Sequence, residues 1–417
     1  MTLEITTARP DPALLDLPWS TPLEDWPENV LAALPRGISR HVVRFVRWRS
    51  LVLAVKEIKA DIADREYEML RSLRRLEVPS VEPFGVVRGR SAGEDGPLDA
   101  ALITQHLQFS LPYRALFSQA LRPDTAVRLM DALALLLVRL HIEGFWWGDV
   151  SLSNTLFRRD AGAFAAYLVD AETGELHERL TDGQRAHDLD IAQVNIAGEL
   201  MDLQAGGHLE GVDPLEVAAS IIERYHLLWD ELTATERFEA GDRWRVDERI
   251  RRLNDLGFDV DELSISTDLG GTELQIQPKV VDAGHHSRRL LQLTGLDVEE
   301  NQARRLLNDL DSYVATTDQQ AADEEIVAHE WLVKVYQPVT RAVPRGMASR
   351  LEPAEVFHEV LEHRWYLSER AGRDIPIEAA LSDYLRTVLP AKPEEQDVVG
   401  VDTIEMPVIA RPDSRAD

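Results

Sequence analysis

The stretch GFWWGDVSLSNTLFRRD occupies residues 144–160 and decides how the surrounding chain is interpreted. It places Asp149 and Asn154 five residues apart in a short polar loop, with two tryptophans before the loop and Leu156 after it. Taken singly, Asp149 could cap a turn and Asn154 could hold the end of a strand, because isolated short motifs are weak evidence. The interpretation therefore depends on what the rest of the chain places around this loop.

The whole chain has 417 residues, no cysteine and a formal net charge of −28. The length favours two or three domains, and the absence of cysteine excludes disulfides and thiolate metal sites. The acidity argues against general attraction to nucleic acid or anionic lipid. Residues 1–26 lack the basic start and apolar run of a secretory signal, and no apolar run approaches the roughly 20 residues that span a bilayer. We expect a cytoplasmic protein with no nucleic-acid partner and no membrane insertion.

The chain before the loop alternates between strand and helix patterns. Residues 41–59 alternate β-branched and polar residues about RWRS, which predicts an antiparallel hairpin. Residues 61–76 carry apolar residues at helical spacing, with Asp61 as the expected N-cap. Further strands are predicted at VEPFGVVRGR and DAALITQHL, and a long helix is predicted over Pro123–Glu143 because Pro lies near its start and Gly just past its end.

Lysine is rare in this sequence and occurs only at positions 56, 59, 279, 334 and 392. Two of these five lie in LAVKEIK, on the second strand of the predicted hairpin. A lysine ammonium is a compact point charge, whereas an arginine guanidinium is a planar fork, so a narrow phosphate site can discriminate between them. Lys56 is therefore a candidate phosphate ligand, although a surface position would explain Lys59 equally well.

Two short strands are predicted after the loop, around a turn at Asp160–Gly162, and their apolar character stops at Asp170. Helices are predicted over Gln184–Leu203 and Pro214–Trp229. Phosphoryl transfer requires a lysine on the phosphates, an Asp and an Asn on the metal ions, and a carboxylate near the attacking hydroxyl. Lys56, Asp149, Asn154 and Asp170 occur in the order that this chemistry uses.

Residues 37–228 resemble the bacterial protein-kinase-like phosphotransferases, in particular the lipopolysaccharide kinases that act on Kdo or heptose. The resemblance implies a bilobal fold, ATP and Mg²⁺ as cofactors, and Asp149 as the catalytic base. It further implies the following roles: Lys56 on the α- and β-phosphates, Glu66 holding Lys56, Asn154 and Asp170 on Mg²⁺, and the linker at Gln105–Leu107 as the adenine-contacting hinge. Gln105 and Leu107 are accordingly cofactor-binding candidates.

The sequence departs from the protein-kinase pattern at three places. Trp147-Gly148-Asp149 stands where protein kinases have His-Arg-Asp, and Asp170-Ala171-Glu172 stands in place of Asp-Phe-Gly. Glu172 resembles the second acid of choline and aminoglycoside kinases and is a further metal candidate. No Gly-rich phosphate loop is visible in the hairpin. Asp188 resembles the helix Asp that braces a kinase catalytic loop, with a solvated helix face as the alternative.

The chain beyond Asp230 is mostly helical in pattern. A capping box at Thr233 and Glu236 predicts a helix there, a strand pair is predicted at DELSIS and ELQIQPKVV, and five helices follow up to residue 388. The segment around LTGLDVEENQARRLLNDL could mimic a helix-turn-helix and offers arginines for phosphates, but neighbouring acids argue against DNA binding; these arginines are Arg288, Arg289, Arg304 and Arg305.

Two histidine pairs in this part were considered as ligands. His358 and His363 are five residues apart, whereas a zincin helix needs four, and His285-His286 is best explained as a surface pair.

The predicted fold class is α+β, with a protein-kinase-like bilobal N-terminal domain and a mostly α-helical C-terminal domain. The expected divisions are an N-terminal extension (1–36), the kinase-like domain (37–228), a helical domain of unknown function (229–392) and a disordered acidic tail (393–417). Two functions remain open: an ATP- and Mg²⁺-dependent phosphotransferase acting on a hydroxyl of a sugar, lipid-linked glycan, small molecule or protein, and a pseudokinase scaffold. The partners expected are a nucleotide, the hydroxyl acceptor and a protein partner of the C-terminal domain.

Overall fold

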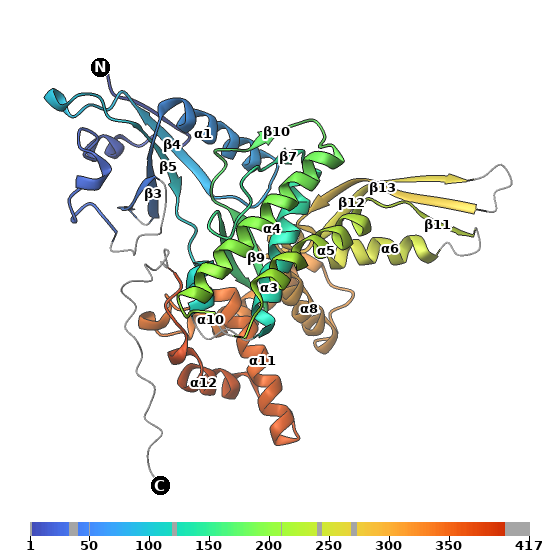
Figure 1. Cartoon of the computed structure of the whole chain (residues 1–417). Coiled ribbons are helices and arrows are strands. Elements are labelled where there is room, and N and C mark those ends of the chain that lie inside the picture. The colour runs from blue at the N-terminus through green and yellow to red at the C-terminus, as the bar shows by residue number, and fades with distance from the viewer. Residues whose placement is uncertain are drawn as a thin grey trace, which may run out of the picture.

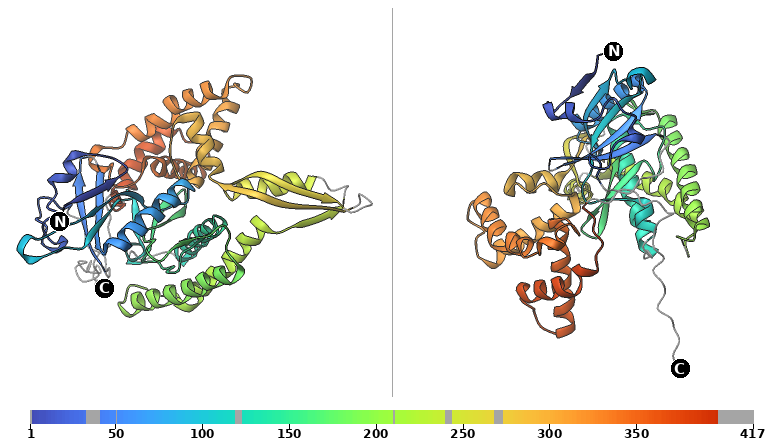
Figure 2. Two further views of the ribbon diagram at one scale, coloured as in Figure 1. Left: turned by 90° about the horizontal axis from the view of Figure 1, so that it is seen from above. Right: turned by 90° about the vertical axis from the view of Figure 1, so that its left-hand side faces the viewer.

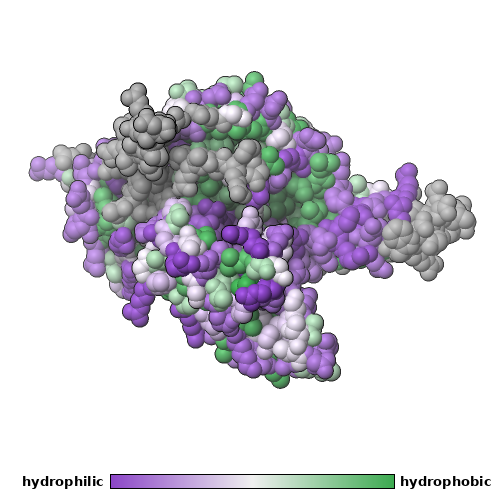
Figure 3. All heavy atoms as spheres, turned by 90° about the horizontal axis from the view of Figure 1, so that it is seen from below, coloured by the Kyte–Doolittle hydropathy of each residue, from purple (hydrophilic) through white to green (hydrophobic). Residues whose placement is uncertain are grey.

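The computed structural model describes residues 2–32, 41–49, 51–118, 123–209, 211–239, 244–267 and 273–396. Its α+β class is as predicted, with a sheet lobe at the N-terminus, a helical lobe, and a C-terminal domain of mostly helices (Figure 1). No helix within the described ranges combines the length and apolar character needed to cross a bilayer. Hydrophilic residues predominate on the face seen in Figure 3, with small hydrophobic areas between them.

The sheet lobe is one antiparallel sheet of five strands in the order β1-β4-β5-β3-β2, with α1 packed against it (Figure 1). The bounds are β1 Glu4–Thr7, β2 Val42–Trp48, β3 Leu51–Ile58, α1 Ala60–Arg75, β4 Glu82–Arg88 and β5 Ala100–Gln105. The predicted hairpin is β2–β3, with Val43 opposite Lys56. α1 begins at Ala60, and its N-cap is Lys59. Asp61 therefore lies in the first turn of the helix and is not its N-cap.

The two faces of this sheet bury different clusters. Trp19 and Trp26 come from the segment before β2 and pack with Leu53 and Val55 on one face. Ile58 packs with Ala63, Tyr67, Val86 and Leu102 on the face that α1 covers. Successive side chains of a strand point to opposite faces, so Lys56, two residues before Ile58, also faces α1. The described part of the predicted N-terminal extension, residues 2–32, is thus integrated into the lobe through β1 and the tryptophans.

The helical lobe contains the loop quoted above. Its three-stranded sheet has the order β6-β8-β9, and a second small sheet pairs β7 with β10. The bounds are β6 Ser110–Pro112, α2 Tyr113–Ser118, α3 Pro123–Ile142, β7 Phe145–Trp146, β8 Thr155–Asp160, β9 Ala163–Leu168, β10 Glu175–Leu176, α4 Asp182–Ala205 and α5 Pro214–Thr233. α3 is buried along most of its length against β9 and α5, and α4 packs on α5. The predicted long helix and the β8–β9 hairpin are confirmed.

The C-terminal domain begins with an arm, a three-stranded sheet of order β11-β13-β12 with α6 alongside (Figures 1 and 2). The bounds are β11 Glu236–Glu239, α6 Trp244–Asp255, β12 Phe258–Thr267 and β13 Glu273–Ala283. The capping box predicted at Thr233 and Glu236 is wrong. Thr233 is the last residue of α5, and Glu236 opens a strand, where its carboxylate is paired with Arg249 and Arg252 of α6.

Helices form the rest of the C-terminal domain. They are α7 His285–Thr294, α8 Glu300–Thr316, α9 Glu324–Trp331, the π-helical segment Leu332–Tyr336, α10 Gln337–Arg341, α11 Pro353–Ala371 and α12 Ile377–Thr387. Trp331, Phe357 and Tyr384 lie in its buried core. Pro338 follows this π-helical segment and has no N–H to donate to the preceding turn.

The β8 strand fastens the C-terminal domain to the helical lobe. Arg158 donates to Glu299 (2.8 Å) and Glu352 (2.6 Å), and Tyr167 of β9 also donates to Glu299 (2.6 Å). Asp160 accepts from the backbone N–H of Asn301 (3.2 Å) and Gln302 (2.7 Å), which are free donors at the start of α8. Asp160 therefore caps a helix that belongs to the other domain.

The end of the described chain also rests on the helical lobe. Arg159 holds Glu395 through bonds of 2.8–2.9 Å, and the Glu395 side chain is 2% exposed. Phe109 donates its N–H to the carbonyl of Gln396 (3.2 Å). The tail predicted to be disordered begins at residue 393. Residues 393–396 are packed against the helical lobe, and residues 397–417 lie outside the described residues.

Candidate active site

Lys56 lies at the centre of a cluster of three carboxylates. Its ammonium donates to Glu66 of α1 (3.1 Å), to Asp170 just after β9 (2.8 Å) and to Glu172 (3.3 Å). The Lys56 side chain is 13% exposed and that of Glu66 is 2% exposed. Residues separated by more than 100 positions thus meet at one point, where the sheet lobe faces the helical lobe.

The three carboxylates carry more negative charge than one ammonium neutralises. Burial lowers the pKa of Lys56, but the charges of Glu66 and Asp170 more than offset this effect and raise that pKa above its ordinary value. Burial raises the pKa of Glu66 to about 7, and the charge of Asp170 acts in the same direction. One ligand oxygen from each of the three carboxylates lies within 4.8 Å of the others, so the cluster suits a cation that accepts oxygen ligands.

The raised pKa of Glu66 leads to a prediction about stability. Its folded-state pKa of about 7 exceeds the ordinary value of 4.5, so the folded state binds the proton more tightly. Stability contributed by this group is present below pH 4.5 and falls as the pH rises to 7. A shift from 4.5 to about 7 corresponds to roughly 3 kcal/mol. In urea unfolding between pH 5 and pH 8, Glu66→Gln should lose less stability than the wild type, and equal losses would contradict the assignment.

The loop that carries Asp149 is closed by Asn154. The Asn154 amide donates to the Asp149 carboxylate (3.0 Å) and to the Asp149 carbonyl (3.0 Å). The interval of five residues is what allows both bonds from one side chain. Gly148 precedes Asp149 at φ +74°, and a Cβ there would approach the Trp146 ring to 2.9 Å, so glycine is required.

Asp188 braces this loop from α4. Its carboxylate accepts from the N–H of Trp147 (2.8 Å) and of Gly148 (2.8 Å), and its side chain is fully buried. The Asp188 carboxylate also lies 3.2 Å from His141, whose pKa burial lowers. The brace interpretation of Asp188 is therefore correct, and the solvated-face alternative is wrong.

Two further residues of α4 position the loop and were not found from the sequence. Asn195 donates to the Val150 carbonyl (3.0 Å) and lies 3.4 Å from the Asp149 carboxylate. Glu199 accepts from the N–H of Leu152 (2.8 Å) and of Ser153 (2.9 Å). The intervals of seven and four residues from Asp188 to Asn195 to Glu199 put all three on one helix face. The sequence signal that could have identified them was a stripe of polar residues on one face of a helix whose neighbouring positions are apolar.

Asn154 and Asp170 lie at the same end of the β8–β9 hairpin. Asn154 immediately precedes β8, and its carbonyl accepts from the N–H of Val169 (3.0 Å), next to Asp170. The Asp170 carbonyl in turn accepts from the Trp147 indole (2.9 Å). The two predicted metal ligands therefore lie at the same end of the hairpin, and Trp147 connects the Asp170 segment with the Asp149 loop.

The predicted hinge leads from β5 into the helical lobe. Gln105 is the last residue of β5, and its side chain accepts from Arg9 (3.2 Å). The Leu107 carbonyl accepts from the Ser110 hydroxyl (2.6 Å). The structure thus connects the lobes through these residues, and their contact with adenine remains a prediction.

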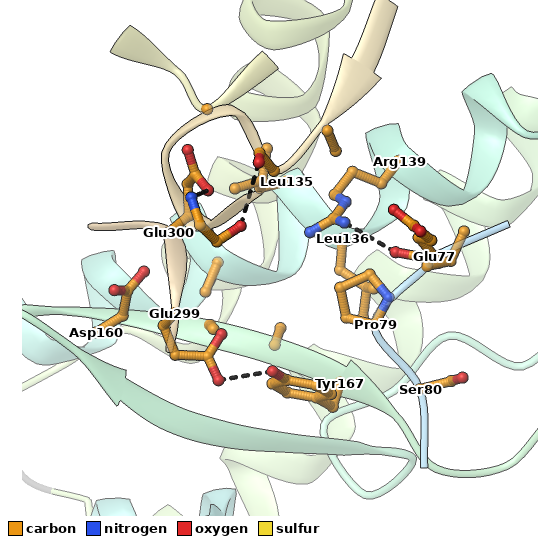
Figure 4. Close-up of a pocket in the computed structure, with 18 of the residues that line it drawn as sticks. Glu77, Pro79, Ser80, Leu135, Leu136, Arg139, Asp160, Tyr167, Glu299 and Glu300 are labelled. Atoms are coloured by element: carbon orange, nitrogen blue, oxygen red, sulfur yellow. Dashed lines mark hydrogen bonds between the residues drawn. The ribbon is translucent and has the colours of Figure 1, made fainter. Parts of the chain in front are cut away.

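A separate cavity of about 490 Å³ lies between the helical lobe and the C-terminal domain (Figure 4). Tyr167 and Glu299 are bonded across one side of it, and Arg139 donates to the Glu77 carbonyl (3.1 Å) on another. Burial raises the pKa of Asp160, which also lines it, to about 7. The polar groups named here already have partners, and the cavity does not include Lys56 or Asp149.

Comparison with known proteins assigns the two parts of the chain. Residues 48–198 match the model of the lipopolysaccharide kinase (Kdo/WaaP) family, which supports a kinase-like phosphotransferase. Residues 227–389 match the model of a domain of unknown function, DUF4032. Among solved structures, "WaaP in complex with acyl carrier protein" is 14% identical and covers 55% of this chain and 99% of its own, with a TM-score of 0.33. No curated protein matched. Residues 48–198 are thus similar to the lipopolysaccharide kinase (Kdo/WaaP) family, and residues 227–389 are similar to the DUF4032 domain.

Proposed function

We propose that this protein is an ATP- and Mg²⁺-dependent phosphotransferase that acts on a hydroxyl group. The observation that carries the proposal is the simultaneous bonding of Lys56 to Glu66 and Asp170 beside a braced Asp149 loop. Phosphoryl transfer depends on positioning and charge stabilisation more than on covalent chemistry. A lysine fixed by a buried glutamate is suited to hold phosphate oxygens, since its charge and position are both set before ligand binds.

The residues present fit a divalent cation. Asp170 and Glu172 contribute carboxylates within 4.8 Å of each other, and Asn154 contributes an amide at the same hairpin end. These residues would hold Mg²⁺, and the bound ion would supply positive charge that offsets the charge of the phosphates. Asp149 would accept the proton of the acceptor hydroxyl, and Asn154 and Asn195 would hold its carboxylate in place.

The acceptor is proposed as a class only. A sugar, a lipid-linked glycan, a small molecule or a protein hydroxyl would all meet Asp149 in the same way. The net charge of −28 does not favour a strongly anionic glycan, so Kdo or heptose is not carried over to this chain.

Thermal unfolding with and without Mg²⁺-ATP tests the nucleotide part of the proposal. A ligand that binds only the folded state stabilises it, by about 2.7 kcal/mol at 100 times its Kd. We expect a rise in midpoint that requires Mg²⁺ and is lost in Asp170→Ala. Glu175→Ala is a matched control, since Glu175 lies on β10 and is half-exposed. No rise at millimolar ATP would refute nucleotide binding.

The pseudokinase scaffold is retained as a second candidate because of the β2–β3 hairpin. Trp48 pairs with Leu51, so only two residues connect the strands, where an active kinase has a Gly-rich loop over the phosphates. Lys56 is also fully engaged by acids in the structure. The same thermal experiment separates the two functions, because a scaffold of this kind needs no Mg²⁺-ATP.

A further inference from the structure

A groove in the C-terminal domain gathers basic and amide side chains away from the Lys56 cluster. It lies along α8 and α11, which pack against each other, and has a volume of about 510 Å³. Its lining comes from four helices and the β8–β9 turn; the residues are Ala161, Asp255, His286, Asn301, Arg304, Arg305, Asn308, His358 and Glu362. Asn301, Arg304, Arg305 and Asn308 follow the helical intervals three, four and seven, so α8 presents all of them to the groove.

The two arginines are only partly engaged. Arg304 donates one N–H to the Asp255 carbonyl (3.1 Å), which leaves most of its guanidinium donors available. Arg305 is exposed and makes no hydrogen bond within the described part of the chain, although it interacts electrostatically with Asp309, one turn further along α8. A guanidinium group with donors available matches the geometry of phosphate oxygens.

His358 provides an independent sign of a missing ligand. Its side chain is 8% exposed, and neither ring nitrogen has a hydrogen-bond partner. The nearest acid, Glu362, lies 3.6 Å from Nε2, beyond normal hydrogen-bonding distance. A buried polar group without a partner is costly, so a groove that leaves His358 unsatisfied is suited to a ligand that accepts hydrogen bonds.

The acids around the groove do not supply that partner. Glu300 is held by His286 (2.7 Å) and by the N–H of Ser287 (3.0 Å). Asp255 and Glu362 are exposed at the rim, where water screens their charge. Within the described residues, neither of them makes an ion pair with Arg304 or Arg305. The acid that acts on Arg305 is Asp309, whose carboxylate already accepts from the Trp331 indole (2.8 Å).

The groove continues into a second hollow of about 320 Å³ that shares Arg305 and Asn308. Trp365 lines this hollow and is 62% exposed, and Arg364 lies beside it. A ligand anchored at Arg305 therefore has room for a further organic group against an exposed aromatic ring.

We propose that this groove binds a small phosphate-bearing molecule, with Arg304, Arg305 and His358 on the phosphate. The site is distinct from the kinase cluster. His358 Nε2 lies 3.8 Å from the position of a Cβ on Gly162, at the turn of the β8–β9 hairpin. Asn154 and Asp170 lie at the opposite end, beyond the six residues of β8, or about 20 Å of strand.

Isothermal titration of the intact chain with inorganic pyrophosphate, without Mg²⁺, tests the proposal. We expect saturable binding that Arg305→Ala weakens at least tenfold and that His358→Gln weakens severalfold. Arg345→Ala should bind as the wild type does, because Arg345 is an exposed arginine outside the groove. The same titration in a Lys56→Ala background removes the contribution of the proposed nucleotide site, so that the Arg305-dependent binding is measured by itself.

Vesicle co-sedimentation identifies the source of the phosphate. Arg305-dependent binding to phosphatidic acid vesicles, with none to phosphatidylcholine vesicles and none to pyrophosphate, would support the same site with a lipid headgroup as ligand. Binding of pyrophosphate alone would support a soluble phosphorylated compound. The proposal is overturned if neither probe binds, or if Arg305→Ala binds either probe as tightly as the wild type.

Discussion

Asp149→Ala is expected to lower the rate of phosphoryl transfer by about 10²–10⁴-fold, the usual contribution of a positioned general base. Asp149 is not part of the hydrophobic core, so unfolding would not account for such a loss of rate. Its carboxylate accepts from the Asn154 and Asn195 amides, while the loop backbone is held by Asp188 and Glu199. The alanine variant therefore keeps the bonds that fix the backbone and loses only the carboxylate. ADP release under saturating Mg²⁺-ATP measures the effect.

The control for this experiment is Asp190→Ala, which removes an exposed acid of α4 close in sequence to Asp188. It should retain the wild-type rate. Asp149→Ala should also retain the thermal shift produced by Mg²⁺-ATP, because the proposed nucleotide ligands are Lys56 and Asp170. Unchanged ADP release in Asp149→Ala would remove Asp149 from the proposed mechanism while leaving nucleotide binding intact.

Local sequence patterns predicted the parts of the fold that depend on short-range order. The β2–β3 hairpin, the long helix α3 and the β8–β9 hairpin follow from alternation, helical spacing and turn residues near each element. The placement of Lys56 beside Asp170 was expected only through the family resemblance. Local spacing cannot bring together residues 114 positions apart, because that contact depends on how the two lobes pack.

Long-range polar contacts were the part that sequence patterns did not predict. Thr233 and Glu236 satisfy a capping-box pattern, yet Glu236 begins strand β11. Its carboxylate pairs with two arginines of α6, which follow it in the chain. Asn195 and Glu199 look like ordinary helix residues until the loop is placed against them. Arg158 and Arg159, near the end of β8, bind acids more than 130 positions away, and no local pattern indicated these contacts. Tertiary context overrode the local pattern in each case.

Arg158→Ala is expected to lower the free energy of unfolding by about 3–5 kcal/mol, the usual cost of breaking a buried ion pair by removing one partner. The Arg158 side chain is 16% exposed, and its partners Glu299 and Glu352 are 10% and 17% exposed. Burial raises the pKa of Glu352, and Arg158 opposes this effect. Without Arg158 the two carboxylates, which both come from the C-terminal domain, lose their shared partner on the helical lobe. Urea unfolding at pH 7 measures the loss.

Restoring charge balance should recover part of this stability. Adding Glu299→Gln and Glu352→Gln to Arg158→Ala removes the two unpaired charges, so the triple variant should be more stable than Arg158→Ala alone. The stability effects of substitutions at contacting residues do not add, so a gain in the triple variant would show that the three side chains form one network. Arg179→Ala, which removes an exposed arginine of the helical lobe, should change stability by less than about 0.5 kcal/mol. A loss in Arg158→Ala no larger than this control's would show that the β8 ion pairs do not hold the two domains together.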